Sequence, residues 1–235
     1  IVMDLRGNGG GHLSEATGLV GLFIRGGPVV QLRETGGRIE VLDDPEPGDV
    51  WDGPLVVLVD RSSASASEIF AAAIQDYGRG LVVGQQTYGK GTVQNLYPLD
   101  RWALGPNAGF GQLTVTIGKY YRVTGDSVQN RGVAPDVTLP SLISAEEVGE
   151  STRDSALPWD RIRAVDFDSE RALSASVPVV TRNHLARLAS DADLKALQGD
   201  VDAFERLRAE KSVSLNLARR KAERERLDAE RLARI

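Results

Sequence analysis

Apolar and polar positions along the first half of the chain form blocks that predict strands and helices in alternation. The apolar run Pro54–Val59 predicts a buried strand, and the small and apolar positions after Ser65 predict a helix that ends near Gly78. A short apolar stretch at Val2 enters a glycine-rich turn, and a helix is expected from Leu13 onward. These blocks indicate an α/β arrangement.

Strand-like patterns fill much of the remaining sequence up to about residue 140. Segments 29–33 and 38–42 flank a Glu-Thr-Gly-Gly turn and predict a β-hairpin. Residues 111–123 predict another strand, with a bulge or bend at Gly118, and 129–140 predicts a loop followed by an edge strand. The expected unit, residues 1–140, is therefore a mixed sheet with packed helices.

The pattern changes beyond residue 141. A polar linker comes first, and helical periodicity then occupies much of the chain to residue 235, which predicts a second, mainly helical domain over 141–235. Its last part, from residue 203, is rich in Arg and Lys and has the pattern of a charged, solvated helix, or of an arm that binds a partner.

Composition narrows the possible functions. The chain has 235 residues, 41% of them hydrophobic, which is enough to bury a core, and no run of 18 or more apolar residues predicts a membrane span. A net charge of −5 argues against nucleic acid as a partner. The chain has no cysteine and two isolated histidines, so neither a disulfide nor a metal site is expected.

Candidate chemistry begins at Ser65, which follows the apolar strand and begins a helix. A serine there faces unpaired backbone N–H groups and can serve as a nucleophile. The alternative is purely structural, because Ser65-Ala-Ser-Glu68 also fits a capping box, in which Glu68 reaches back to the N-cap.

Lys90 strengthens the catalytic interpretation. It stands 25 positions after Ser65, between Gly89 and Gly91, where it is expected to end the next strand. A lysine between two glycines has little packing role, and burial in an apolar pocket can lower its pKa from about 10.4 to about 7–8, as a general base requires. Otherwise Lys90 would be a solvated turn lysine.

The segment Gly84–Gly91 also nearly matches a P-loop, which would indicate nucleotide binding. A P-loop needs Ser or Thr directly after the lysine to hold magnesium, and then a helix. This chain has Gly91 at that position, followed by a strand-like pattern. The near match therefore remains only a remote alternative.

The glycines before His12 provide a third element. Backbone N–H groups in such a turn can face an anion, so the turn fits a phosphate site, an oxyanion hole or a simple strand-to-helix connection. As an oxyanion hole, it would pair an N–H of Gly10 or Gly11 with the N–H of Ala66. One such donor contributes about 10²–10³ in rate.

Three segments together closely resemble the C-terminal processing peptidases, in their tail-specific protease branch. They are Asp4-Leu-Arg-Gly-Asn-Gly-Gly-Gly11, Ser63-Ala-Ser-Ala-Ser-Glu-Ile-Phe70 and Gly89-Lys-Gly-Thr-Val-Gln94. Further matches lie at Tyr120-Tyr-Arg-Val, Gln129-Asn-Arg-Gly-Val-Ala-Pro-Asp136, Ala156-Leu-Pro-Trp-Asp160 and Val213-Ser-Leu-Asn216. The resemblance spans nearly the whole chain.

The resemblance implies a serine endopeptidase with a Ser-Lys dyad and no cofactor. It makes Ser65 the nucleophile, Lys90 the general base and Gln94 the residue that orients the lysine amine. Gly11 and Ala66 take the oxyanion positions. On an ideal strand Gln94 would lie about 13 Å from Lys90, so their contact requires a bend at Gly91.

Asp76 and His12 are two further candidate residues. Asp76 occupies the position of a family acid, but it lies eleven residues after Ser65, about 16 Å along a helix, so we expect a supporting role or an ordinary solvated helix residue. His12 follows the glycines where the family has no histidine, so a Ser-His-Asp triad through His12 is the alternative to a turn histidine.

The resemblance also predicts the substrates, a partner, the cellular location and further domains of the protein. Substrates would be unfolded or loosely folded proteins with apolar C-terminal tails, an adaptor protein is a possible partner, and the location would be the periplasm or cell envelope. The PDZ domain and the first part of the peptidase core are expected upstream of Ile1. A segment without them could instead be a catalytically silent binding or scaffold unit.

Overall fold

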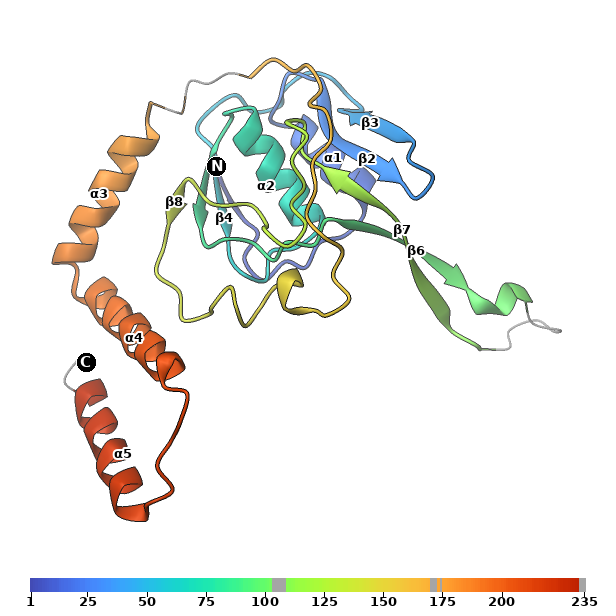
Figure 1. Cartoon of the computed structure of the whole chain (residues 1–235). Coiled ribbons are helices and arrows are strands. Elements are labelled where there is room, and N and C mark those ends of the chain that lie inside the picture. The colour runs from blue at the N-terminus through green and yellow to red at the C-terminus, as the bar shows by residue number, and fades with distance from the viewer. Residues whose placement is uncertain (103–108, 170–172, 174, 233–235) are drawn as a thin grey trace.

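The structure is a computed structural model that describes residues 1–102, 109–169, 173 and 175–232. Within these residues, two four-stranded sheets and two α-helices form the body of the molecule, and three further α-helices extend from it (Figure 1). The predicted mixed α/β fold is confirmed. Its parallel and antiparallel strands, however, are separated into two sheets and do not share one.

The first sheet is parallel throughout. Its strands are, in spatial order, β1 (Val2–Asp4), β4 (Val56–Val59), β5 (Leu81–Gly84) and β8 (Val137–Thr138). Parallel strands require crossover connections: the one from β1 to β4 includes α1 (Leu13–Gly21), and the one from β4 to β5 is α2 (Ala66–Asp76) with its flanking loops, while the chain between β5 and β8 passes through the second sheet. The strand expected near Val2, the buried strand at 54–59 and both early helices are thereby confirmed.

The second sheet is antiparallel. Its strands are, in spatial order, β3 (Ile39–Asp43), β2 (Pro28–Glu34), β7 (Gln112–Tyr121) and β6 (Thr92–Pro98). The predicted hairpin is β2–β3. Val93 pairs with Gly118 and Gln94 pairs with Thr116, so Ile117 is an extra residue on β7 and the irregularity expected at Gly118 lies directly beside it.

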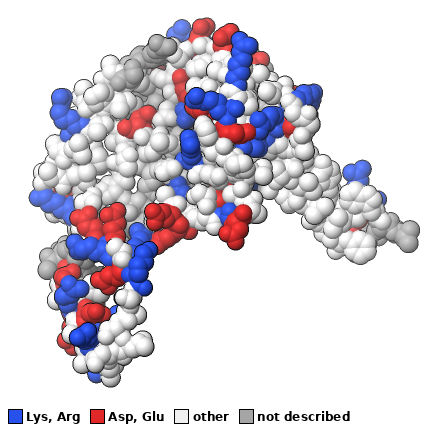
Figure 2. All heavy atoms as spheres, viewed as in Figure 1, with Lys and Arg blue, Asp and Glu red and all other residues white. Residues whose placement is uncertain are grey.

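The far ends of β6 and β7 form an arm that projects from the body (Figure 1). A short 3₁₀ helix, η1 (Leu99–Trp102), follows β6 at its tip. Leu96, Trp102 and Phe110 are exposed on this arm, and Figure 2 shows few charged side chains there.

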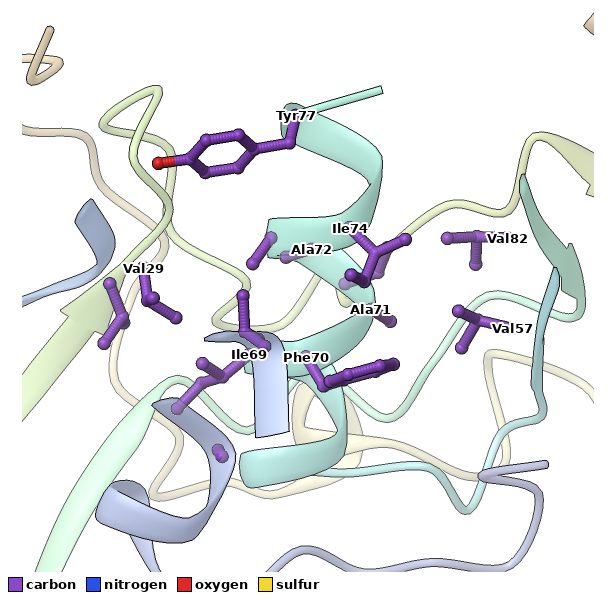
Figure 3. Close-up of a cluster of buried hydrophobic side chains, with 14 of the residues drawn as sticks. Val29, Val57, Ile69, Phe70, Ala71, Ala72, Ile74, Tyr77 and Val82 are labelled. Carbon is purple, nitrogen blue, oxygen red and sulfur yellow. The ribbon is translucent and has the colours of Figure 1, made fainter. Parts of the chain in front are cut away.

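Helix α2 is the centre of the core. Every residue from Ser67 to Ile74 is buried, because small alanines allow close packing on all sides. In Figure 3, Phe70 and Ile74 point toward Val57 and Val82 of the parallel sheet, while Val29 of the antiparallel sheet lies on the other side of the helix. Because α2 packs against both sheets, the position of its first residue is fixed relative to both.

One strand boundary differs from the prediction. Lys90 was expected to end the strand after α2, but β5 already ends at Gly84 and Lys90 lies in the loop before β6. The backbone N–H groups of Gly89 and Lys90 donate to the side chain of Glu68 and not to a neighbouring strand. The loop is therefore held by side-chain hydrogen bonds.

The region after β8 first returns along the body and then becomes helical. It contains a 3₁₀ turn, η2 (Glu150–Thr152), and the helices α3 (Val177–Ser190), α4 (Ala192–Ala209) and α5 (Leu217–Leu232). Asp191 ends α3 and caps α4, since its carboxylate accepts from the next helix's first N–H groups. No helix in the described residues is long and apolar enough to cross a membrane.

The segment that follows η2, residues 153–169, forms a strap that binds the antiparallel sheet through Asp160. The Asp160 carboxylate accepts hydrogen bonds from Arg33 on β2 (2.5 Å), and from Lys119 and the Tyr121 hydroxyl on β7. Burial opposes ionisation, but the hydrogen bonds of Lys119 and Arg33 outweigh it and lower the pKa of Asp160. The ionised carboxylate thus fastens the strap.

We expect Asp160→Asn to lower the free energy of unfolding by roughly 1.5–3 kcal/mol at pH 7, the usual contribution of hydrogen bonds to a charged group. A carboxyl with a lowered pKa stabilises the fold above its unfolded pKa of about 3.9, and this contribution is lost as the pH falls through the lower folded value. The difference in the free energy of unfolding between wild type and Asp160→Asn, measured by urea unfolding, should therefore become smaller in acid.

The matched control is Asp228→Asn on the exposed surface of α5, where the change should stay within about 0.5 kcal/mol. A difference between wild type and Asp160→Asn that is absent at pH 7, or that does not narrow in acid, would contradict the role given to this carboxylate.

Candidate active site

The turn between β4 and α2 is built from short polar side chains. Asp60 directly follows β4, and its carboxylate accepts from the backbone N–H groups of Ser62 (2.8 Å) and Gly7 (3.0 Å), so it joins this turn to the glycine-rich turn after β1. The hydroxyls of Ser63 and Ser67 donate to backbone carbonyls of that second turn, those of Leu5 and Asn8. These two serines hold the turns together.

Ser65 lines the same cavity as Lys90, which neither Ser63 nor Ser67 lines. It is the N-cap of α2 and has φ 57° and ψ −115°, a backbone conformation that residues other than glycine rarely adopt. Such conformations cost about 1–3 kcal/mol and persist only where the surroundings hold them. The contacts that hold Ser65 are therefore central to the site.

The first of these contacts is the buried carboxylate of Glu68. One oxygen, Oε2, accepts from the backbone N–H of Ser65 (2.8 Å) and of Lys90 (2.9 Å). The other, Oε1, accepts from the Gly89 N–H (2.7 Å) and the Thr87 hydroxyl (2.5 Å). Burial raises the pKa of Glu68, and these four donors act against that rise. Glu68 thus binds the serine turn to the lysine loop.

The second contact is the hydroxyl of Tyr120, on β7. It lies 2.7 Å from the carbonyl oxygen of Lys90 and 3.2 Å from that of Ser65. Burial raises the pKa of Tyr120 well above its usual range, so the hydroxyl keeps its proton and remains a donor. Ser65 and Lys90 are therefore joined twice, through their N–H groups and through their carbonyls.

The side chain of Lys90 meets Gln94. Lys90 Nζ donates to Gln94 Oε1 at 3.1 Å, and Lys90 is half-buried, not enclosed as a buried base would be. The loop is supported from behind, because the Gly91 N–H donates to the fully buried side chain of Gln129 (2.8 Å) and the Asn130 N–H donates to the Gly89 carbonyl. Glycine is required at both flanking positions, since a Cβ there would collide with this turn.

The glycine-rich turn comes close to the start of α2. A Cβ at Gly10, which has φ +103°, would lie 2.8 Å from Ser65 Cβ and 2.9 Å from Ala66 N, so only glycine fits. The Gly10 N–H donates to Asn8 Oδ1. Within the described residues, the N–H groups of Gly11 and Ala66 have no hydrogen-bond partner. They remain free to bind an anion.

A cavity of about 650 Å³ brings the predicted site residues together. Ser65, Ala66, Lys90, Gln94, Gly11 and His12 all line it. Apolar side chains form much of the remaining wall, namely Leu13, Leu32, Ile69, Val93, Leu96 and Ile117. Such a cavity fits an apolar group beside the serine.

Asp76 lies at the other end of α2, away from this cavity. Its buried carboxylate forms a two-pronged ion pair with Arg122 after β7, which also bonds to Gln75. Burial raises the pKa of Asp76, and the hydrogen bonds and charge of Arg122 oppose that rise. The position is not that of a solvated helix residue, and the pair ties the helix end to the antiparallel sheet.

Two alternative chemistries gain no support from the structure. The N–H groups of Gly89 and Lys90, which a P-loop would offer to phosphate, are bound to the Glu68 carboxylate, and β6 follows where a helix is needed. His12 is exposed at the N-terminus of α1, and no carboxylate among the described residues bonds to it. No metal-binding group of His, Asp or Glu side chains occurs in the described part of the chain either.

Sequence reasoning missed two residues that shape the site. Glu68 was considered only as part of a capping box; its bond to the Ser65 N–H is present, but the three bonds to residues 87–90 cannot be foreseen from local spacing. Tyr120 is 30 positions from Lys90 and 55 from Ser65, and only the pairing of β7 with β2 and β6 brings it near.

Comparison with known proteins places the chain in a family. Residues 1–139 match Peptidase family S41, and residues 143–235 match the C-terminal domain of tail specific protease. The Tail-specific protease of Haemophilus influenzae is 44% identical over 241 residues, which cover 99% of this chain and 34% of that protein. A Carboxy-terminal-processing protease of Bartonella bacilliformis is 39% identical over 139 residues, covering 59% of this chain and 30% of that one.

A solved structure agrees with these matches. The photosystem II D1 C-terminal processing protease has a TM-score of 0.51 and 32% sequence identity, over 61% of this chain and 36% of that one. The present chain spans about a third of the length of the two curated relatives. Since the family match covers more than half of the sequence, the chain belongs to peptidase family S41.

Proposed function

We propose that the protein is a serine endopeptidase of the tail-specific type, in which Ser65 is the nucleophile and Lys90 the general base. The observation that carries the proposal is the double junction of Ser65 and Lys90, through Glu68 and Tyr120, at the edge of one cavity. A serine and a base held in this way fit the requirements of nucleophilic catalysis.

The mechanism follows from these positions. Unprotonated Lys90 Nζ takes the proton of the Ser65 hydroxyl while Oγ attacks the carbonyl carbon of the peptide bond. The N–H groups of Gly11 and Ala66 bind the oxyanion that forms. The lysine then gives its proton to the leaving amine, and an acyl-enzyme remains. Water, activated by the same amine, attacks the ester and restores Ser65.

The remaining site residues would act through these groups. Gln94 accepts a hydrogen bond from Lys90 Nζ and would fix the direction of the amine. Asp76 would be a positioning residue, because its ion pair with Arg122 holds the far end of the helix that begins at Ser65. No cofactor takes part in this scheme.

Substrate class and context extend the proposal. The apolar wall of the cavity suits extended, apolar segments, which supports unfolded or loosely folded proteins with apolar C-terminal tails as substrates. An adaptor protein and a location in the periplasm or cell envelope belong to the same proposal. So does a division into a peptidase core portion, 1–140, and a helical domain, 141–235; the two family matches, 1–139 and 143–235, support it.

In the full-length protein, we expect Ser65→Ala to abolish cleavage of an unfolded reporter that ends in an apolar tail. Lys90→Ala should reduce kcat by at least about 10²-fold, because it removes the general base. Both variants should keep the wild-type unfolding transition, which circular dichroism measures. His12→Ala is the control and should retain activity.

Loss of activity in His12→Ala together with retained activity in Lys90→Ala would identify a histidine base instead. A protein that folds but cleaves nothing, with or without Ser65, would favour the scaffold interpretation.

Glu68→Gln should lower both activity and stability. The new amide nitrogen replaces one acceptor oxygen and faces an N–H or hydroxyl donor, so at least one buried donor loses its partner, at a cost of about 1–3 kcal/mol. As the serine and lysine segments shift, kcat should fall roughly tenfold or more, with KM less affected. Steady-state kinetics and urea unfolding measure the two effects.

Glu40→Gln, on the exposed face of β3, provides the matched control and should change neither quantity measurably. Unchanged kcat in Glu68→Gln would show that the carboxylate does not hold the catalytic pair.

A further inference from the structure

A second cavity, of about 380 Å³, adjoins the active-site cavity. The two share Lys90, Thr92 and Gln94, so the proposed base lines both cavities. The other residues that line the second cavity are different, and they include Tyr88 and Arg153. The mechanism above does not use this space.

Part of the wall of this cavity comes from beyond the peptidase core. Val148, Glu150 and Arg153 line it, and they lie in the region that matches the C-terminal domain of tail specific protease. Lys90 and Tyr88 lie in the region that matches Peptidase family S41. The cavity is therefore shared between two parts of the chain that match different families.

The contributed wall is held firmly in place. The buried Arg61 side chain donates from Nε to the Val148 carbonyl (2.9 Å), and the Glu150 N–H donates to the Tyr88 carbonyl (3.0 Å). Gly149 lies between them with φ +147°, and a Cβ there would collide with the Arg61 guanidinium. The segment is thus preformed beside Lys90.

Arg153 presents a cation to this cavity. Its Nε donates to the Tyr88 hydroxyl at 3.0 Å and lies 3.9 Å from Glu150 Oε2, and its side chain is 64% exposed. Within the described part of the chain, its two terminal nitrogens have no hydrogen-bond partner. A guanidinium whose terminal nitrogens are open offers a fork that matches the two oxygens of a carboxylate.

We propose that this cavity is a substrate subsite in which Arg153 binds a carboxylate of the polypeptide being cut. The inference rests on the proposed function and adds a specificity residue to it. The carboxylate has two possible sources, an Asp or Glu side chain near the cleaved bond, or the chain's own C-terminal group. Both place the same two oxygens on the guanidinium.

Binding is measured first, in the full-length protein carrying Ser65→Ala, so that peptides are not consumed. Fluorescent peptides with an apolar tail carry one Glu, moved through successive positions, each with a matched Gln peptide. A second pair ends in a free carboxylate or in an amide. In one of these pairs, Arg153→Gln should weaken binding of the carboxylate peptide by roughly tenfold and leave binding of its matched partner unchanged. Arg153→Lys should restore part of the lost affinity.

The pair that responds identifies the source of the carboxylate. Arg220→Gln is the matched control, because Arg220 also forms an ion pair within its own segment but lies on α5. It should leave the ratio of the two affinities unchanged in every peptide pair. Equal losses for both members of every pair, or no loss at all, would overturn the subsite, since Arg153 would then bind the peptide backbone or nothing.

Cleavage of the same peptides by the protein with Ser65 intact separates the two proposals. Ser65-dependent cleavage without any Arg153-dependent preference would overturn the subsite and leave the proposed function standing. Arg153-dependent binding without cleavage would support the subsite and overturn the proposed function. If neither the binding preference nor the cleavage is observed, both proposals are overturned.

Discussion

The candidate active site depends on one buried carboxylate, that of Glu68. It accepts four hydrogen bonds, two of them from the backbones of Ser65 and Lys90, which are 25 residues apart in the sequence. An ionised group removed from water is costly unless its oxygens are satisfied, so the carboxylate is stable only where the serine turn and the lysine loop are both in place. The same interaction that orders the loop therefore sets the distance between the two segments.

Other parts of the fold serve this junction. Helix α2 carries Glu68 and packs between both sheets, and the Tyr120 hydroxyl reaches the carbonyls of the same two segments from β7. At the far end of the helix, Asp76 is bound by Arg122. The strained backbone of Ser65 is thus held at its N–H and its carbonyl, while its side chain faces the cavity.

The sequence predicted what is local and missed what is distant. Strand and helix periodicity, the hairpin at β2–β3 and the glycine turn were visible because each depends on a few neighbouring residues. The pairing of Ser65 with Lys90 was predicted from the residues around them and was strengthened by the family resemblance, but their common cavity is seen only in the structure. Lys90 was misplaced at a strand end, because the loop around it is ordered by Glu68 and Gln129, whose side chains arrive from other segments. No local pattern could indicate those contacts, or that residues 148–153 would return to the site.

The most direct test of the catalytic pair is covalent labelling with a serine-directed fluorophosphonate, mapped by mass spectrometry of the digested full-length protein. If Ser65 is the nucleophile and Lys90 its base, a single adduct forms on Ser65, and it forms slowly or not at all when Lys90 is replaced by alanine. An adduct on Ser63 or Ser67, or labelling of Ser65 that proceeds at the same rate without Lys90, would contradict it.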